Sequence, residues 1–600
     1  MRMKIIVSAS ALLLVMSGVG EVLAQKGVNA ISLSGKPKYK NIPGEYLSYA
    51  SKNAKQGGEL KLMDSRLFDS FNPFLEDVNR PAGLNLVYET LTSQTLDEPF
   101  TAYGHIAERI ELAKNKLSVT FYINKNARFQ DGSFINAQDV KASFETAVQL
   151  SPRTAQYYRD VKEVIIKDIH TIRFNFKRIN PELHMILGGL TIFKSTDLDK
   201  ENISKRQLVP FIGSGPYKIK NYKMGQYIVY EKINNYWGSD LLVNRGKYNF
   251  NRVRYVAIKD STARLEAFKA GEFDIRNFNS AKEWASFTGE KVQKKLIVKK
   301  NLPHENNQGM QALIFNLRKP IFKDIRVREA LNLAFNFPWT NKNIFYSQYT
   351  RSKSYYSNSE LGAKGLPSEE ELKLLEPLKA MVPETVFNEP MGVEVSRFEE
   401  EKNYHRKRLR RAVQLLNSAG WKTKRGVLQK NGEPFQFEIL LWDPLFKRIV
   451  EPYLKNLQSL GIGRNQVSYR VVDLSLWQKK LFAFDFDMVT MVIPQSNSPG
   501  NEQRFYFHSS QANVKNSNNF SGFTDPAVDA LIDKIITAPD RKSLITATHS
   551  LDRVLMKNFY LIPSWHITHH RVAYWDKFGI PAWEPKYYSP SDWWFYWWLK

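Results

Sequence analysis

The sequence of 600 residues contains no cysteine. Without a thiol, the chain can form no disulfide, no thiolate metal site and no cysteine nucleophile. It also lacks the cysteine to which a lipid would be attached behind an export signal. The mature protein is therefore expected to be freely soluble rather than lipid-anchored.

Long apolar runs are scarce as well. A positively charged start and the apolar run 5–16 precede Val22-Leu23-Ala24, which has the form of a small-residue cleavage site. The run is too short to span a bilayer, for which about 20 apolar residues are needed. Residues 1–24 are thus predicted to be a cleavable signal peptide, and the mature protein is predicted to be periplasmic.

Acidic residues are outnumbered by basic ones, 60 to 86, which gives a formal net charge of +26. Such a charge suits nucleic acid, an anionic membrane or acidic ligands. The lysines are spread along the whole chain, however, and exported proteins rarely meet nucleic acid. Most of the charge is interpreted as solvated surface, with steering of a ligand or partner as the alternative.

Catalytic motifs are missing too. The glycine-rich stretch 213–216 has neither the spacing nor the lysine of a phosphate-binding loop, and Ile212 stands where a GxSxG motif needs its first glycine. There is no HExxH sequence. No catalytic residue is predicted, and an exported hydrolase is the less favoured alternative.

Two groups of possible metal ligands are interpreted as structural. His566, His569 and His570 have ligand spacing on a helix, but their neighbours favour a strand. Asp485 and Asp487 alternate on a predicted strand with no third ligand nearby. Neither a metal nor a cofactor is predicted.

The stretch 117–144 predicts a strand, a turn and a helix. Residues 117–123 alternate between apolar and polar side chains, and 130–133 have turn chemistry. Asn136 is a suitable helix cap, with Asp139 at the third helical position.

This stretch also carries a family resemblance. Ala-Arg-Phe at 127–129, Asp-Gly at 131–132, Ala-x-Asp-Val at 137–140 and Ser-Phe at 143–144 resemble the signature of the family 5 extracellular solute-binding proteins. These are the peptide-, dipeptide- and nickel-capturing subunits of bacterial ABC importers. Further landmarks occur in family order, at 72–74, 88–91, 213–217, 236–238, 260–274, 315–331, 412–421 and 523–532.

The resemblance implies a mixed α/β, two-lobed periplasmic binding protein of type II (cluster C) with a hinge and three domains. Domain I would comprise 25–76, 213–306 and 553–600. Domain II would be 77–212, and domain III 307–552. The segment 213–217 is expected to cross between lobes, and the terminal tryptophans Trp593, Trp594, Trp597 and Trp598 to pack against the first lobe rather than a membrane.

Four stretches of the sequence resemble the Yej-type branch of the family, whose members bind peptides and admit peptide-carried antibiotics such as microcin C. The stretches that carry this resemblance are the insert 352–402, the loop 498–504 and the segments 574–579 and 593–594. Ser368 and Glu371 predict a capping box, with a short helix that begins there and ends before Pro377, inside an insert otherwise expected to be a surface excursion. The basic run 405–411 is predicted to be the solvated face of a helix.

The resemblance implies an oligopeptide ligand, an inner-membrane ABC permease with its ATPase subunits as partners, and a monomer. The same fold can instead bind a metal chelate, haem or a cell-wall fragment. The usual amine-binding aspartate is absent, and Glu502 is the candidate replacement, against a structural ion pair with Arg504. The predicted ligand-binding residues are Arg66, Trp442, Trp477, Gln495, Asn497, Glu502 and Arg504.

Overall fold

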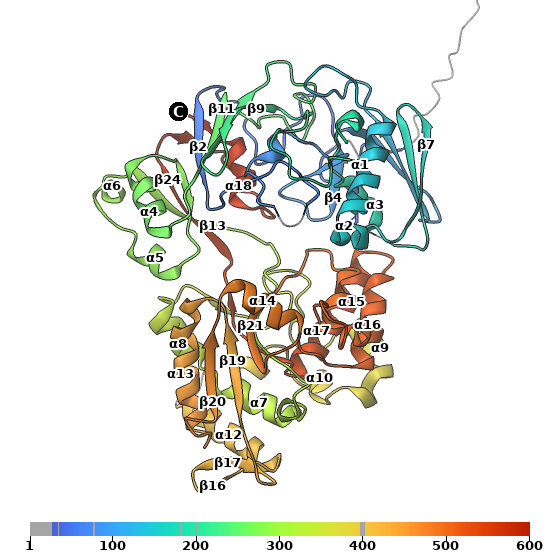
Figure 1. Ribbon diagram of the computed structural model, residues 1–600. Helices are drawn as coiled ribbons and strands as arrows, with labels where there is room; N and C mark the ends of the chain where they lie inside the picture. Colours follow the sequence, from blue (N-terminus) through green and yellow to red (C-terminus); the bar gives the residue numbers. More distant parts are fainter. Residues whose placement is uncertain (1–26, 34, 76–77, 181, 199–200, 397–402) are drawn as a thin grey trace, which may run out of the picture.

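The computed structural model describes residues 27–600 except 34, 76–77, 181, 199–200 and 397–402. The predicted signal peptide therefore lies outside the described residues. The chain folds into two lobes joined by a narrow connection (Figure 1). Among the described helices, none has both the length and the apolar composition needed to cross a membrane.

The first lobe is built around a four-stranded sheet in the order β2 (Glu59–Asp64), β11 (Arg252–Ala257), β10 (Tyr227–Lys232) and β9 (Tyr217–Lys223). Strands β2 and β11 are parallel, and the other pairs are antiparallel. Trp593 and Trp597 share the apolar core of this lobe with β2 and are fully buried. The C-terminal tryptophans thus pack against the first lobe, as predicted.

A second sheet of the first lobe has the order β5 (Ala107–Leu112), β6 (Ser118–Ile123), β8 (Thr171–Phe176) and β7 (Val161–Asp168). Helix α1 (Ala137–Leu150) packs on it, with the Phe144 and Phe174 rings 5.4 Å apart. Asn136 and Asp139 form a reciprocal capping box at its start. The predicted strand, turn and helix are confirmed.

The glycine-rich crossing 213–217 runs within the first lobe, so the prediction that it passes between lobes was wrong. The backbone nitrogens of Ser214 and Gly215 both donate to the carbonyl oxygen of Val87. A Cβ atom on Gly213 would lie only 2.3 Å from that oxygen. Glycine is needed here because two backbone segments approach more closely than a side chain allows.

The hinge sheet is the part of the first lobe nearest the connection. Its order is β12 (Ile275–Asn277), β24 (His569–Trp575) and β13 (Ile297–Pro303), with helix α5 (Ala281–Ser286) against it. Residues 304–309 lead from β13 into the second lobe, and residues 567–568 lead back from β23 (Trp565–His566). The predicted strand over the histidines is confirmed, and no described group of three or more potential ligands could hold a metal ion.

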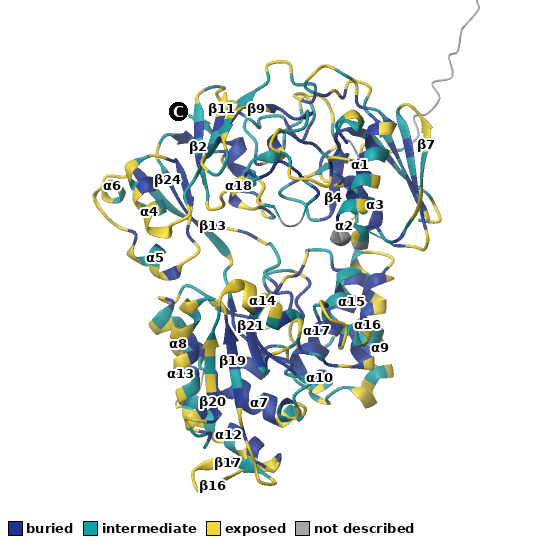
Figure 2. Cartoon of the chain, in the orientation of Figure 1, coloured by how far each residue is buried: buried dark blue, intermediate teal, exposed yellow. Residues whose placement is uncertain are grey.

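The second lobe has a five-stranded sheet buried on both faces. Its order is β20 (Val467–Val471), β19 (Phe437–Leu441), β21 (Met488–Ile493), β14 (Met310–Phe315) and β22 (Leu561–Pro563). Successive residues of β14 enter opposite cores, because side chains alternate across a strand. Figure 2 shows β19 and helix α7 (Ile325–Ala334) as largely buried, whereas strand β16 (Lys422–Lys424) at the tip of the lobe is exposed.

Helices cover both faces of this sheet. On one side are α7 (Ile325–Ala334), α12 (Tyr404–Ser418) and α13 (Lys447–Gln458), and on the other α16 (Pro526–Ile536) and α17 (Arg541–Lys557). Helix α12 contains the basic run 405–411. One of its basic residues departs from the predicted solvated face: Arg408 is 1% exposed and donates to the carbonyl oxygen of Phe335 at 2.9 Å.

The described part of the insert, residues 352–396, is anchored in the second lobe, which corrects the expectation of a surface excursion. Its side chains Tyr355, Leu361, Leu375, Val386 and Val395 belong to the core of α16 and α17. Helix α9 (Glu369–Leu375) begins directly after its cap residue Ser368, as predicted, and the Ser368 Oγ accepts from the Glu371 nitrogen at 3.2 Å. The Glu371 carboxylate pairs with Arg553 instead of completing the predicted capping box.

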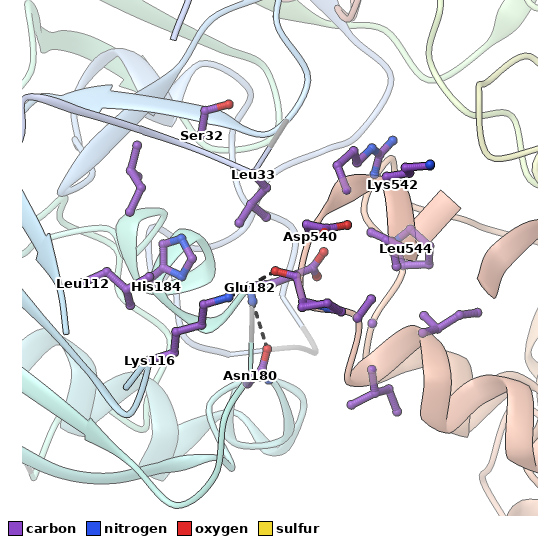
Figure 3. Close-up of a pocket in the computed structure, with 18 of the residues that line it drawn as sticks. Ser32, Leu33, Leu112, Lys116, Asn180, Glu182, His184, Asp540, Lys542 and Leu544 are labelled. Carbon is purple, nitrogen blue, oxygen red and sulfur yellow. Dashed lines mark hydrogen bonds between the residues drawn. The ribbon is translucent and has the colours of Figure 1, made fainter. Parts of the chain in front are cut away.

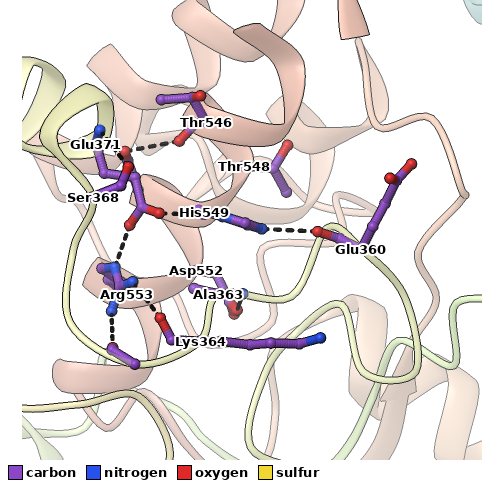
Figure 4. Close-up of polar contacts among 12 residues, drawn as sticks. Glu360, Ala363, Lys364, Ser368, Glu371, Thr546, Thr548, His549, Asp552 and Arg553 are labelled. Carbon is purple, nitrogen blue, oxygen red and sulfur yellow. Dashed lines mark hydrogen bonds and ion pairs between the residues drawn. The ribbon is translucent and has the colours of Figure 1, made fainter. Parts of the chain in front are cut away.

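Polar contacts fasten the insert to α17 (Figure 4). The buried Arg553 guanidinium pairs with Glu371 and donates to the carbonyl oxygens of Lys364, Gly365 and Leu366. His549 bridges Glu371, at 3.1 Å, and the carbonyl oxygen of Glu360, at 2.8 Å. Burial alone would lower the pKa of His549, but the hydrogen bond to Glu371 raises it.

Candidate interlobe binding site

Two adjoining cavities lie between the lobes on the side away from the hinge sheet. The first, of about 480 Å³, is bounded in the first lobe by residues 31–33 and by β5, and in the second by the start of α17 (Figure 3). The second, of about 560 Å³, is bounded by residues 157–186 and 482–520. Asn180, Glu182 and Asn501 line both. Their volumes are those of small-molecule sites, about 300–1,000 Å³.

The lobes touch around these cavities. Arg159 Nη2 of the first lobe donates to Asn501 Oδ1 of the second at 3.1 Å, and Asn501 Nδ2 donates back to Asp160 at 3.2 Å. Farther along, the Arg541 guanidinium lies 3.9 Å from the centre of the Phe100 ring. These contacts exist only while the lobes are together, so the structure represents a closed arrangement on this side.

Two carboxylates from opposite lobes face each other where the cavities meet. Glu182 precedes α3 (Leu183–Gly188) of the first lobe, and Glu502 begins α15 (Glu502–Phe507) of the second. Their Oε2 atoms lie 3.0 Å and 3.6 Å from the position that a Cβ atom on Gly500 would occupy. Glycine at this position therefore keeps the space between the carboxylates open.

Among the described residues neither carboxylate forms a salt bridge, although the charge of Arg541 offsets part of the rise in the pKa of Glu182. Glu502 accepts hydrogen bonds from the Gly500 nitrogen at 3.0 Å, Gln503 Nε2 at 3.2 Å and Ser496 Oγ at 3.4 Å. Glu182 Oε1 is buried without a hydrogen-bond partner among the described residues. Burial raises the pKa of both carboxyls, and the charge of Glu502 adds to the rise at Glu182. The arrangement favours a proton or a bound cation.

This electrostatic arrangement predicts proton release on binding of a cationic ligand. Because both pKa values are raised by folding, protonation stabilises the folded ligand-free protein, and this contribution decreases as the pH rises above the usual glutamate value of 4.5. A bound ammonium group favours the charged carboxylates instead. Calorimetry of peptide binding above pH 4.5, in buffers of different ionisation enthalpy, should show protons released. An equal release by the Glu182→Gln variant would contradict this origin.

Three of the sequence-predicted residues lie in this region. Glu502 lines the second cavity. Gln495 accepts from Gln503 Nε2 at 2.6 Å and so supports the residue next to Glu502. Asn497 joins the connection to the second lobe: its Oδ1 accepts from the nitrogen of Asn307 in the connection at 2.9 Å, and its carbonyl oxygen accepts from Arg541 at 2.9 Å.

Of the seven predicted residues, Glu502 alone is among the described residues that line the two cavities, and the remaining four, apart from Gln495 and Asn497, lie elsewhere. Arg504 forms its ion pair with Asp533, so the alternative pairing of Arg504 with Glu502 was wrong. Arg66 pairs with Asp64 near the protein surface. Trp442 and Trp477 lie 6.5 Å apart on the second lobe, and Trp442 is 42% exposed.

Sequence reasoning missed the first-lobe half of the site. Glu182, Arg159 and Asn180 belong to weakly patterned segments, and no local motif distinguishes them. The Arg541 guanidinium also depends on the insert, because Glu360 pairs with it. A signal for these residues would have required knowledge of which segments meet across the lobes.

Comparison with known proteins decides the family. The model of the bacterial extracellular solute-binding proteins, family 5, matches residues 101–515. The chain belongs to this family. Its members are the solute-binding subunits of ABC importers and work with a permease and ATPase subunits, so an extracytoplasmic location is expected.

Two curated relatives align over most of the chain. "Uncharacterized protein YejA" of Escherichia coli is 36% identical, with 94% of this chain and 93% of the relative covered. "Probable peptide-binding protein YejA" of Agrobacterium fabrum is 34% identical, with 99% and 98% covered. The chain therefore belongs to the YejA-like branch, as its sequence predicted.

Solved structures support the fold. The oligopeptide-binding protein AppA of Bacillus subtilis, in complex with a nonapeptide, has a TM-score of 0.65 at 22% identity, with 91% of this chain and 100% of AppA covered. NikA of Brucella suis, in complex with Fe(III)-EDTA, has a TM-score of 0.68 at 20% identity, with 88% and 98% covered. The fold is thus that of the two-lobed family 5 binding proteins, as predicted.

Proposed function

We propose that the protein captures oligopeptides between its lobes and delivers them to an inner-membrane ABC permease. The observation that carries the proposal is the pair of facing carboxylates, Glu182 and Glu502, at the meeting point of the two cavities. A peptide has one feature that this pair can bind regardless of sequence, its N-terminal ammonium group. Charge-assisted hydrogen bonds from that group to both carboxylates would join the lobes.

Closure supplies the mechanism of capture. A ligand shifts the lobes towards the closed state by the contacts it makes only there. Here a cation between Glu182 and Glu502 removes the repulsion that otherwise opposes closure. Micromolar affinity, about −8 kcal/mol, would allow both capture and release to the permease. The protein would act as a periplasmic monomer after signal-peptide cleavage, and peptide-carried antibiotics such as microcin C would enter by the same route.

The experiment that tests the proposal is mass spectrometry of ligand released from the purified protein by denaturation. A set of short peptides of mixed sequence is expected, and their lengths would give the range that the cavities accept. Peptide fragments carrying cell-wall sugars would keep the amine site and narrow the substrate class. A metal chelate, the kind of ligand seen in the NikA structure, or a single non-peptide mass would overturn the peptide assignment.

Tryptophan fluorescence gives a separate prediction for Trp442. If this exposed side chain contacts ligand when the lobes close, peptide binding will change the emission of the wild type more than that of Trp442→Phe. The buried Trp477 at 6.5 Å provides the comparison, because Trp477→Phe removes a ring that is 7% exposed. An unaltered signal in Trp442→Phe would place Trp442 outside the ligand site.

A further inference from the structure

One face of the hinge sheet carries three cationic side chains at the junction of the lobes. Arg276 of β12 and Lys299 of β13 are both paired with Ala573 of the central strand β24. Arg571 lies two residues earlier on β24 and therefore shares the face. Arg276 is 5% exposed and Arg571 is 1% exposed. This group is called the hinge cation cluster.

The cluster has more positive charge than its contacts neutralise. Arg276 Nη2 pairs with Glu283 of α5 at 2.5 Å, and Lys299 Nζ donates to two carbonyl oxygens at the end of α5, each at 2.8 Å. Within the described part of the chain, Nε and Nη1 of Arg276 are buried without a hydrogen-bond partner. The same holds for all three side-chain nitrogens of Arg571. Buried guanidinium groups ordinarily have anionic or carbonyl partners, because burial of an unpaired charge is costly.

Residues of the second lobe pack against the hinge cation cluster and the segment next to it. The Arg571 Cζ atom lies 4.8 Å from the centre of the Tyr349 ring. Tyr349 donates its hydroxyl to the carbonyl oxygen of Asn279 at 3.3 Å, and Gln348 Nε2 donates to that of Ala281 at 3.1 Å. A guanidinium that stacks on a ring by its face keeps its N–H groups, which lie in its plane, directed sideways at an acceptor.

We propose that Arg571, assisted by Arg276, binds a carboxylate at the junction of the lobes. A carboxylate matches the planar fork of a guanidinium with two parallel hydrogen bonds. It would reduce the excess positive charge of the hinge cation cluster and, because Tyr349 belongs to the other lobe, would stabilise the closed arrangement. The carboxylate has two possible sources, the C-terminus of a bound peptide or a free small carboxylate. Only the first source rests on the proposed function.

Two measurements on the full mature protein test the site. The first is a thermal-unfolding titration with sodium acetate at constant ionic strength, with chloride as the replaced anion. A saturable rise in Tm is expected for the wild type and not for Arg571→Gln. The second compares binding of peptide acids with their C-terminal amides, for which loss of about tenfold is expected if the peptide supplies the carboxylate.

A matched control is Arg252→Gln, because Arg252 lies on the same lobe with a side chain that is 52% exposed and pairs with Glu231. It should behave as the wild type in both assays. If Arg571→Gln does not fold, Arg571→Lys replaces it. The positive charge remains in this variant, but the preference for acetate over chloride should be lost, because an ammonium group cannot form the two parallel hydrogen bonds of a guanidinium.

The outcomes are distinct. Loss of the acid-over-amide preference in Arg571→Gln would identify the peptide C-terminus as the source. An acetate effect that depends on Arg571, without any acid-over-amide preference, would identify a free carboxylate, and it would stand even if the protein bound no peptide. Absence of both effects in the folded wild type would overturn the site.

Discussion

Replacing Glu502 with glutamine should weaken the binding of free peptides by about 10- to 100-fold. A hydrogen bond to a charged group contributes about 1.5–3 kcal/mol, and each 1.4 kcal/mol is about a factor of ten in affinity. Peptides with an acetylated N-terminus lack the ammonium group and should bind the variant as they bind the wild type. Calorimetric titration of one peptide in both forms measures the difference.

Glu182→Gln should have the same effect from the other lobe, since its carboxylate faces that of Glu502 across Gly500. Both variants should also raise the Tm of the ligand-free protein, because each removes one of two carboxyls that repel each other. A lower peptide affinity together with a higher Tm would show that the variants lose the amine-binding group, because a destabilised fold would lower both. Equal losses for free and acetylated peptides would exclude both residues as the amine site.

The second large effect concerns the anchor of the insert. Arg553→Met should reduce the free energy of unfolding by about 3–5 kcal/mol, the usual result of removing one partner of a buried ion pair. Arg553 is 1% exposed, and its loss takes the guanidinium donor from three carbonyl oxygens and from Glu371, which keeps only its contact with His549. Urea unfolding followed by circular dichroism measures the change.

Two further variants test this explanation. Lys542→Met removes an ion pair with Glu370 in which the lysine side chain is 82% exposed, so its cost should stay below about 0.5 kcal/mol. Combining Arg553→Met with Glu371→Leu should restore part of the stability, because no buried carboxylate is then left with His549 as its one charged partner. A loss of less than about 1 kcal/mol in Arg553→Met would show that the insert does not depend on this pair.

The anchor also reaches the interlobe site. Glu360, whose carbonyl oxygen bonds to His549, pairs through its carboxylate with Arg541, and Arg541 stacks on Phe100 of the first lobe. The insert that distinguishes this branch in sequence thus helps to position a cation at the edge of the first cavity. Variants that loosen the insert should for this reason also weaken closure of the lobes.

The sequence by itself determined the local elements and the family. The capping box of Asn136 and Asp139, the alternation along β6 and the helical spacing in α12 involve residues a few positions apart, so the chain shows them directly. The order of the family motifs along the chain likewise indicated the two-lobed fold. Glu502 was identified within the candidate site because the sequence of its loop differs from the family pattern. The difference falls where peptide-binding relatives usually carry the aspartate that binds the ligand's amine.

Only the tertiary structure decided which charged groups meet. Glu182 and Glu502 are brought together by the contact between the lobes, and Arg571 reaches Tyr349 through the hinge. The same holds for Arg408, whose position in the basic run resembles that of its solvated neighbours. It is buried because its guanidinium donates a hydrogen bond to the carbonyl oxygen of Phe335, in another segment of the chain. Burial and charge pairing depend on neighbours distant in the chain, whereas caps and periodicity depend on neighbours within a few residues.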